Sequence, residues 1–145
     1  MENLDRVIEL VSSSTLPMII ALLKVTIPLT LLSFSLGLVI AIITAVARLS
    51  NIKILKFIFA TYVWIFRGTP LLVQLFIVFY GLPSLGVTLD TWSAATIAFS
   101  LNVGAYASES VRAAILSVPK GQWEAATSLG MTHYQILKRI IAPQA

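Results

Sequence analysis

VTIPLTLLSFSLGLVIAIITAVA, from Val25 to Ala47, is a run of 23 residues without a charged side chain. A helix needs about 20 such residues to cross the hydrocarbon core of a bilayer, so this run predicts a transmembrane helix. The 145-residue chain as a whole agrees, with 58% hydrophobic residues, 11% charged residues and a mean hydropathy of +0.93. Because soluble domains contain about 25% charged residues, we expect an all-α membrane protein.

Two further apolar runs, residues 57–80 and 92–115, predict two more transmembrane helices. The second span is interrupted by Arg67-Gly68-Thr69-Pro70, where the proline removes a backbone hydrogen bond and the glycine weakens the preceding turn. We expect two half-helices, with Thr69 as the N-cap and Pro70 as the first helical residue of the second half. The expected architecture is three transmembrane helices, the second of them broken.

The N-terminal segment, residues 1–24, precedes the first span. Its apolar residues Leu4, Val7, Ile8 and Val11 recur at helical spacing, which predicts a short amphipathic helix along the membrane surface. Lys24 is expected to separate this segment from the first span.

Positive charge is concentrated in the connector of residues 48–56, which holds Arg48, Lys53 and Lys56. By the positive-inside rule this connector is cytoplasmic, the N-terminus lies outside, and the loop after the third span is cytoplasmic again. The formal net charge of +4 comes from such short loops between apolar runs, so nucleic-acid binding is not expected.

Small residues recur every fourth position in two of the expected spans. Ser33, Gly37, Ala41 and Ala45 form one such face, and Ser100, Gly104 and Ser108 form the other. Small faces let helix backbones approach closely, so we interpret them as packing surfaces, with a lining of the substrate path as the alternative.

Polar residues in and beside the spans are candidates for a substrate pathway or gate: Arg67, Gly68, Thr69, Pro70, Gln74, Asn102 and Glu109. An arginine deep in a bilayer costs at least about 2.5 kcal/mol and normally faces an interior or a partner. An equally weighted alternative places Arg67 at the cytoplasmic interface, where it reaches lipid headgroups and is structural. Glu109 and Arg112, three residues apart, favour an ion pair over contact of Glu109 with a cationic substrate.

The last segment, residues 117–145, is too polar to span and has the pattern helix, glycine, helix. Gly130 is placed to end the first helix in a left-handed conformation, which glycine adopts at low cost. Thr132 and Gln135 have the spacing of a capping box that starts the second helix.

The chain carries no signature of an enzyme. It has no G-x-x-x-x-G-K-[ST] stretch, no cysteine and a single histidine, His133, so a P-loop, a thiolate site and a cluster with metal-ligand spacing are all excluded. No cofactor is expected on this chain.

Several motifs in order resemble the polar amino-acid uptake branch of the permease subunits of bacterial ATP-binding-cassette importers. The family's EAA pattern matches at Glu124-Ala125-Ala126, Gly130, Ile140 and Pro143, with Ala142 where the family has leucine. The other motifs are FRGTPLLVQLF from Phe66 to Phe76, GLP from Gly81 to Pro83, GAY from Gly104 to Tyr106, and SVPKGQWEAA from Ser117 to Ala126.

The resemblance implies a subunit of the bacterial inner membrane that pairs with a second, identical or different, permease subunit. Its other partners would be an external substrate-binding protein, membrane lipid and a cytoplasmic ATPase that holds ATP and Mg²⁺. It implies that the polar loop couples to that ATPase through Gly121, Trp123, Glu124, Ala125, Ala126 and Gly130. Glu124 would anchor the loop, Ala125 and Ala126 would keep its contact face slim, Trp123 would seat the helix and Gly130 would fix the bend.

Family members also continue with further spanning helices, so we expect this chain to be the N-terminal part of a longer permease or a truncated product. Two alternatives remain open from the sequence. One is a passive channel or membrane scaffold, and the other is an importer subunit for a different small solute.

Overall fold

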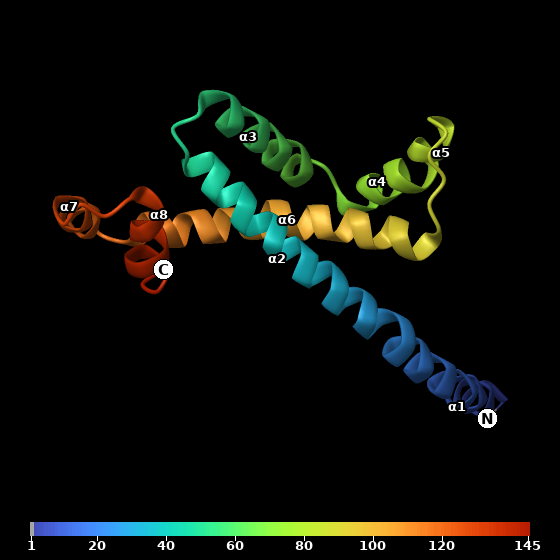
Figure 1. Cartoon of the computed structure of the whole chain (residues 1–145). Coiled ribbons are helices and arrows are strands. Elements are labelled where there is room, and N and C mark those ends of the chain that lie inside the picture. Colours follow the sequence, from blue (N-terminus) through green and yellow to red (C-terminus); the bar gives the residue numbers. More distant parts are fainter. Residues whose placement is uncertain (1) are drawn as a thin grey trace.

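The computed structural model describes residues 2–145, with the side chains of residues 2–5, 7 and 8 left aside. Every regular element in this part of the chain is helical (Figure 1). The elements are α1 (Glu2–Ala21), α2 (Ile27–Leu49), α3 (Lys53–Gly68), α4 (Leu71–Phe76), α5 (Leu82–Ser84), α6 (Thr91–Ser117), α7 (Lys120–Ser128) and α8 (His133–Ile136), with π-helical turns at Leu22–Thr26, Ile77–Gly81 and Leu137–Ile141.

The N-terminal segment differs from the expectation, because α1 and α2 form one helix with no break at Lys24. Lysine is a good helix former, so its charge alone does not end a helix. The irregularity is the π-helical turn Leu22–Thr26, where Ile27 N–H donates to the carbonyl five residues back, at Leu22. It lies just before Pro28, whose ring and missing N–H disturb the preceding turn.

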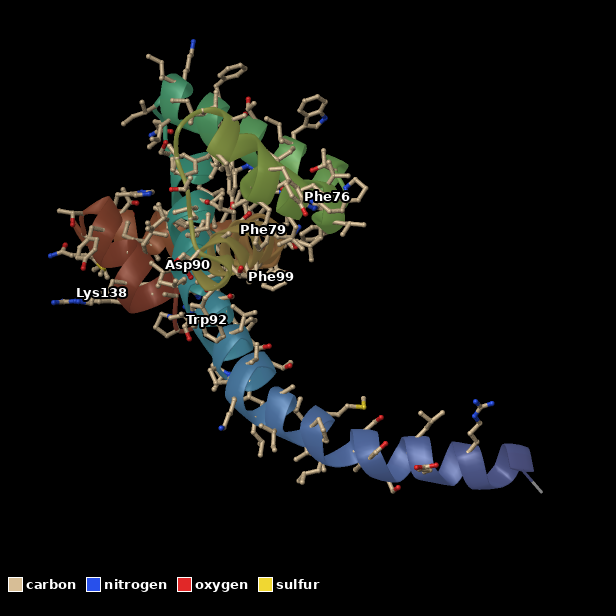
Figure 2. All side chains as sticks on the ribbon, turned by 90° about the vertical axis from the view of Figure 1, so that its right-hand side faces the viewer. Phe76, Phe79, Asp90, Trp92, Phe99 and Lys138 are labelled. Atoms are coloured by element: carbon tan, nitrogen blue, oxygen red, sulfur yellow. The ribbon has the colours of Figure 1, made fainter. Side chains whose placement is uncertain are left out.

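This joined helix projects far beyond the other elements (Figures 1 and 2). Its apolar part, Glu9–Leu49, is 41 residues long and meets the length and composition of a membrane span. At 1.5 Å per residue it is about 60 Å long, roughly twice the thickness of a hydrocarbon core. The joined helix is therefore longer than a single crossing of a bilayer requires.

The second expected span is broken where the sequence indicates, and its two parts, Lys53–Gly68 and Leu71–Ser84, are bent by 108°. The pair qualifies as a second span only if the two parts are taken together. The predicted cap is wrong: Pro70 has ψ 140° and is itself the N-cap, so α4 starts at Leu71. Thr69 instead has an extended backbone before the proline, which ends α3, and its hydroxyl donates to the Ile65 carbonyl at 2.9 Å.

The core is the crossing of α2 and α6 (Figure 1). The small faces predicted as packing surfaces are buried in it: Ser33, Gly37, Ala41, Ala45, Ser100, Gly104 and Ser108. A Cβ on Gly37 would lie 2.6 Å from Val103 Cγ1, and one on Gly104 would lie 2.6 Å from Ile40 Cγ2. The two helices can approach this closely only because both glycines lack a side chain.

Candidate functional site

Helix α6 carries a polar stripe on a face different from the one that packs on α2. The stripe consists of Asn102, Tyr106, Glu109 and Arg112, spaced four, three and three residues apart. Residues at this spacing lie above one another on a helix. The stripe meets the end of α3 and the start of α4, which places the break in the second expected span beside polar partners on α6.

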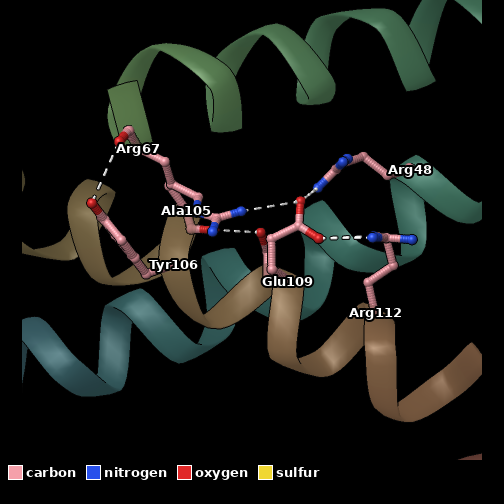
Figure 3. A network of polar contacts seen from close by, with 7 residues as sticks. Arg48, Arg67, Ala105, Tyr106, Glu109 and Arg112 are labelled. Carbon is pink, nitrogen blue, oxygen red and sulfur yellow. Dashed lines mark hydrogen bonds and ion pairs between the residues drawn. The ribbon is translucent and has the colours of Figure 1, made fainter. Parts of the chain in front are cut away.

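Glu109 is the centre of an ion cluster (Figure 3). Its Oε2 accepts from Arg112 Nε at 3.0 Å and Nη2 at 2.9 Å, so the predicted pair within α6 is confirmed. Its Oε1 accepts from Arg48 at the end of α2 and lies 3.7 Å from Arg67 Nη1 at the end of α3. One carboxylate therefore joins three helices.

Arg67 has a second partner on the same stripe (Figure 3). Its guanidinium carbon lies 5.5 Å from the centre of the Tyr106 ring, a distance at which a cation and an aromatic face attract. The Tyr106 hydroxyl lies 3.5 Å from the Arg67 carbonyl. The arginine of the broken span thus has two partners within this chain, Glu109 and Tyr106, and it shares the first with Arg48 and Arg112.

Gln74 ties the break together and is buried. Its Nε2 lies 2.8 Å from the Phe66 carbonyl, 3.1 Å from the Thr69 carbonyl and 2.9 Å from Thr69 Oγ1. Its Oε1 accepts from Asn102 Nδ2 at 3.0 Å. One amide thereby satisfies oxygens freed at the end of α3 and links α4 to α6, which is what a break in an apolar layer requires.

The seven candidate pathway residues therefore form two neighbouring groups. Gln74 is hydrogen-bonded to both Thr69 and Asn102, with Pro70 beside them as the cap of α4. The other group borders a cavity of about 390 Å³ lined by Arg48, Ala60, Val63, Trp64, Arg67, Gly68 and Glu109.

Sequence reasoning missed Arg48 and Tyr106 as members of this site. In the sequence Arg48 belongs to the basic connector of residues 48–56, and nothing local pairs it with a residue 61 positions away. Tyr106 could have been found, because it lies three residues before Glu109 on the face that also carries Arg112.

The C-terminal unit has the predicted turn chemistry. Gly130 has φ +73°, and the N–H groups of Gly130 and Met131 donate to the carbonyls of Thr127 and Ala126, which is a Schellman ending for α7. Thr132 and Gln135 form the capping box of α8. Both elements pack on a small cluster made of Val118, Ala126, Ile136 and Ile141, with Ile115, Trp123, Met131, Leu137 and Ile140 around it.

Helix α7 divides the candidate coupling residues between two faces. Trp123 and Ala126 face the cluster, and the Trp123 ring lies 5.4 Å from the His133 ring. Gly121, Glu124 and Ala125 are exposed, and together with Ser128 they form the outer stripe of the helix. Ala126 is only 3% exposed, so it does not share the exposed face on which Gly121 and Ala125 lie, contrary to the expectation that Ala125 and Ala126 both belong to a contact face.

No group of three His, Asp or Glu side chains that could hold a metal ion occurs in the described part of the chain. The site's chemistry is that of guanidinium, carboxylate and amide groups. These can bind anions or polar solutes and can hold helices together.

Comparison with known proteins gives concordant matches. A family model described as "Binding-protein-dependent transport system inner membrane component" matches residues 37–145. The chain is 58% identical over 137 residues to the L-cystine transport system permease protein TcyB of Bacillus subtilis (strain 168), covering 94% of this chain and 58% of that protein. It is 40% identical over 131 residues to the arginine transport system permease protein ArtQ of the same organism, covering 90% and 60%.

A solved structure is also similar. The crystal structure of an amino acid ABC transporter with histidines contains a chain that is 38% identical, with a TM-score of 0.81. The match covers 93% of this chain and 63% of that one. The chain thus spans about three fifths of the length of the relatives it matches.

Proposed function

The chain belongs to the family of binding-protein-dependent transport system inner membrane components, and on this premise we propose that it is part of a permease subunit of an ATP-driven importer for polar amino acids. Relatives named for L-cystine and arginine transport support the substrate class. In this proposal the energy comes from a partner ATPase that holds ATP and Mg²⁺. A second permease subunit would complete the pathway, and an external binding protein would deliver the solute.

The observation that carries the proposal is the outer stripe of α7, formed by Gly121, Glu124, Ala125 and Ser128. A surface of small residues around one carboxylate lets a partner approach the helix backbone closely, as a docking site requires. The stripe belongs to a unit with its own packed cluster, so a force on it is transmitted rather than absorbed by a loop.

The proposed topology has three spans, at residues 25–47, 57–80 and 92–115, with the N-terminus outside and α7 in the cytoplasm. The charge bias of residues 48–56 supports this orientation. Under it, α6 runs from the outer surface to the coupling unit, and α1 extends beyond the outer surface of the membrane.

The proposed mechanism is a two-state movement that passes from the coupling unit to the break. ATPase closure would push α7, and the cluster around Val118 would move the end of α6 with it. Glu109 then links α6 to α2 and α3, and the Gln74–Asn102 bond links it to α4. The seven candidate residues, from Arg67 to Glu109, would line or control the pathway that this movement opens.

The docking proposal is tested by Gly121→Leu in the full-length protein, with Gln122→Leu on the flank of α7 as the matched control. A Cβ at Gly121 meets nothing within 4 Å and Gly121 is exposed, so the fold should be retained. We expect Gly121→Leu to lose co-purification of the ATPase while Gln122→Leu keeps most of it. Equal recovery of the ATPase with both variants would contradict docking through this stripe.

Coupling is tested separately by Gly130→Val, with Gly86→Val as the control. Both glycines have positive φ, +73° and +85°, so valine strains both turns similarly. Only the turn at Gly130 holds α7 against the cluster around Val118. We expect ATP-driven uptake of an amino acid to fall strongly with Gly130→Val and little with Gly86→Val, and unchanged uptake with Gly130→Val would refute the coupling role.

A further inference from the structure

The ion cluster has more positive than negative charge. Glu109 is the one carboxylate among the described residues that contacts Arg48, Arg67 and Arg112, so the three guanidinium groups share a single carboxylate and the cluster carries a net charge of +2. The side chains of Arg48 and Glu109 are only 17% and 22% exposed, which limits compensation by water. A cluster of this kind is stabilised by a bound anion.

The depth of the cluster follows from the three helices that build it. Arg48 is the second-last residue of α2, so its guanidinium lies at the end of that helix, and Arg67 reaches the same carboxylate. Helix α6 has 27 residues and is about 40 Å long, roughly 10 Å more than a hydrocarbon core. Under the proposed topology, on which this step rests, the cluster lies at the cytoplasmic boundary of the bilayer.

The cavity beside the cluster has a lining that suits a lipid headgroup. It lies between α3, the end of α2 and Glu109 of α6, and Arg48 and Arg67 both border it. Gly68 leaves it open, since a Cβ there would meet nothing within 4 Å. Trp64, at the rim, is 76% exposed, and tryptophan prefers the depth of lipid headgroups.

We propose that this cavity binds the phosphate of an anionic phospholipid of the cytoplasmic leaflet, held by Arg48 and Arg67 and flanked by Trp64. Guanidinium groups match phosphate oxygens in charge and geometry. Basic pockets between transmembrane helices on the cytoplasmic side are a recurrent form of lipid headgroup site. The lipid supplies the negative charge that the cluster lacks, and Arg67 acts at the interface without entering the middle of the bilayer.

The first test compares Arg67→Gln with Lys56→Gln, in which the same charge is removed from an exposed position of α3 away from the cavity. The full-length protein is placed in nanodiscs of phosphatidylethanolamine with phosphatidylglycerol, and the lipid retained after extraction is counted by native mass spectrometry. We expect retained phosphatidylglycerol to fall about five-fold with Arg67→Gln, as for the loss of one basic contact, and not with Lys56→Gln. Equal losses would mean general surface attraction and would overturn the site.

A second variant, Gly68→Leu, fills the cavity without changing any charge. Retention should fall here too, while the melting temperature in nanodiscs of phosphatidylethanolamine alone should equal that of the parent protein, because a Cβ at this position meets nothing within 4 Å. Full retention by Gly68→Leu, or no retained anionic lipid in the parent protein, would overturn the proposal. The second result would point to an acidic segment of a protein partner as the counter-charge.

A third arm separates lipid from free phosphate. Nanodiscs of phosphatidylethanolamine alone receive inorganic phosphate at millimolar concentration, and thermal stabilisation is compared with that from phosphatidylglycerol. We expect stabilisation by the lipid only, and equal stabilisation by phosphate would identify a free-anion site instead. None of these arms uses the ATPase or an amino acid, so their failure is distinguishable from failure of the proposed transport function.

Discussion

Helix α6 packs against its neighbours through two interfaces, called seams below, that differ in the kind of contact they contain. Against α2 it packs through small residues, with glycines at the closest approach and the hydroxyls of Ser33, Thr44 and Ser100 buried without a hydrogen-bond partner. Against α3 and α4 it is joined by the Glu109 cluster and by the Gln74–Asn102 bond. The first seam depends mainly on shape, with the Arg48–Glu109 ion pair at the end of α2, whereas the second depends on polar contacts that can be exchanged.

This difference indicates which part of the molecule can move. A steric seam tolerates little displacement, because packed interiors do not deform continuously. A seam of hydrogen bonds and ion pairs can break and form again with other partners at modest net cost. We therefore expect α2 and α6 to move as one body, with the break between α3 and α4 as the adjustable part.

The largest expected effect comes from breaking the steric seam with Gly37→Leu. The new side chain would collide with Val103 and the Ser100 carbonyl, at 2.6 Å and 3.2 Å from its first carbon. Overpacking of this kind costs about 3 kcal/mol, and salt should not change the loss. Thermal unfolding in detergent measures it, with Gly68→Leu, which meets open space, as the control. Similar melting temperatures for the two variants would contradict a close-packed seam.

The next effect should come from Glu109→Gln, which removes the shared carboxylate of the polar seam. Three guanidinium groups then repel one another, and because they are partly exposed we expect a loss of about 2 kcal/mol, less than for a fully buried pair. High salt should reduce this loss, in contrast to Gly37→Leu. The matched control is Glu124→Gln on the exposed face of α7, which should leave stability unchanged. A salt-independent loss at Glu109 would argue that packing, and not charge, governs this seam.

A smaller effect is expected from Gln74→Leu, which keeps the side chain's bulk and removes its hydrogen bonds. The carbonyl oxygens of Phe66 and Thr69 would lose their donor, which should lower the free energy of unfolding by about 1–2 kcal/mol. Asn102→Leu removes only the link to α6, so its loss should be smaller. Hydrogen exchange should show faster opening of α4 in Gln74→Leu with α2 unaffected. Equal protection of α4 in the parent and the variant would refute the role of Gln74 in the break.

The smallest expected effect concerns Asp90, which caps the helix shared by both seams. Hydrogen bonds from Ser93 hold the pKa of the Asp90 carboxyl below its usual range. Since the folded pKa is the lower one, this stabilisation is complete above the ordinary pKa and is lost as pH falls through the folded value. Asp90→Asn keeps a good N-cap but does not titrate, so its melting temperature should fall less than the parent's between pH 5 and pH 2. If the melting temperatures of the two proteins fell in parallel with pH, the Asp90 carboxylate would make no measurable contribution to stability.

Much of the local structure could be predicted because it depends on neighbours in the chain. The bounds of α6, the break near Pro70, the left-handed Gly130 and the Thr132–Gln135 box all follow from residues within a few positions. The two errors also concern short-range rules. At Lys24 the helix continues because lysine is a good helix former, and at the start of α4 the N-cap is Pro70 instead of Thr69. The candidate site was only half predictable, since Arg48 joins it from another helix.

The sequence by itself determined that the chain is helical and apolar, where its main helices and turns lie, and that Glu109 pairs with Arg112, because these properties depend on composition and on spacings within one helix. Only the tertiary structure decided that Glu109 also binds Arg48 and Arg67, that Gln74 closes the break, and that Ala126 is buried while Ala125 is exposed. The reason is physical: which helix faces meet depends on side chains far apart in the chain competing for the same surface. The spacing of residues within a helix shows which side chains share a face, but not which other helix that face contacts.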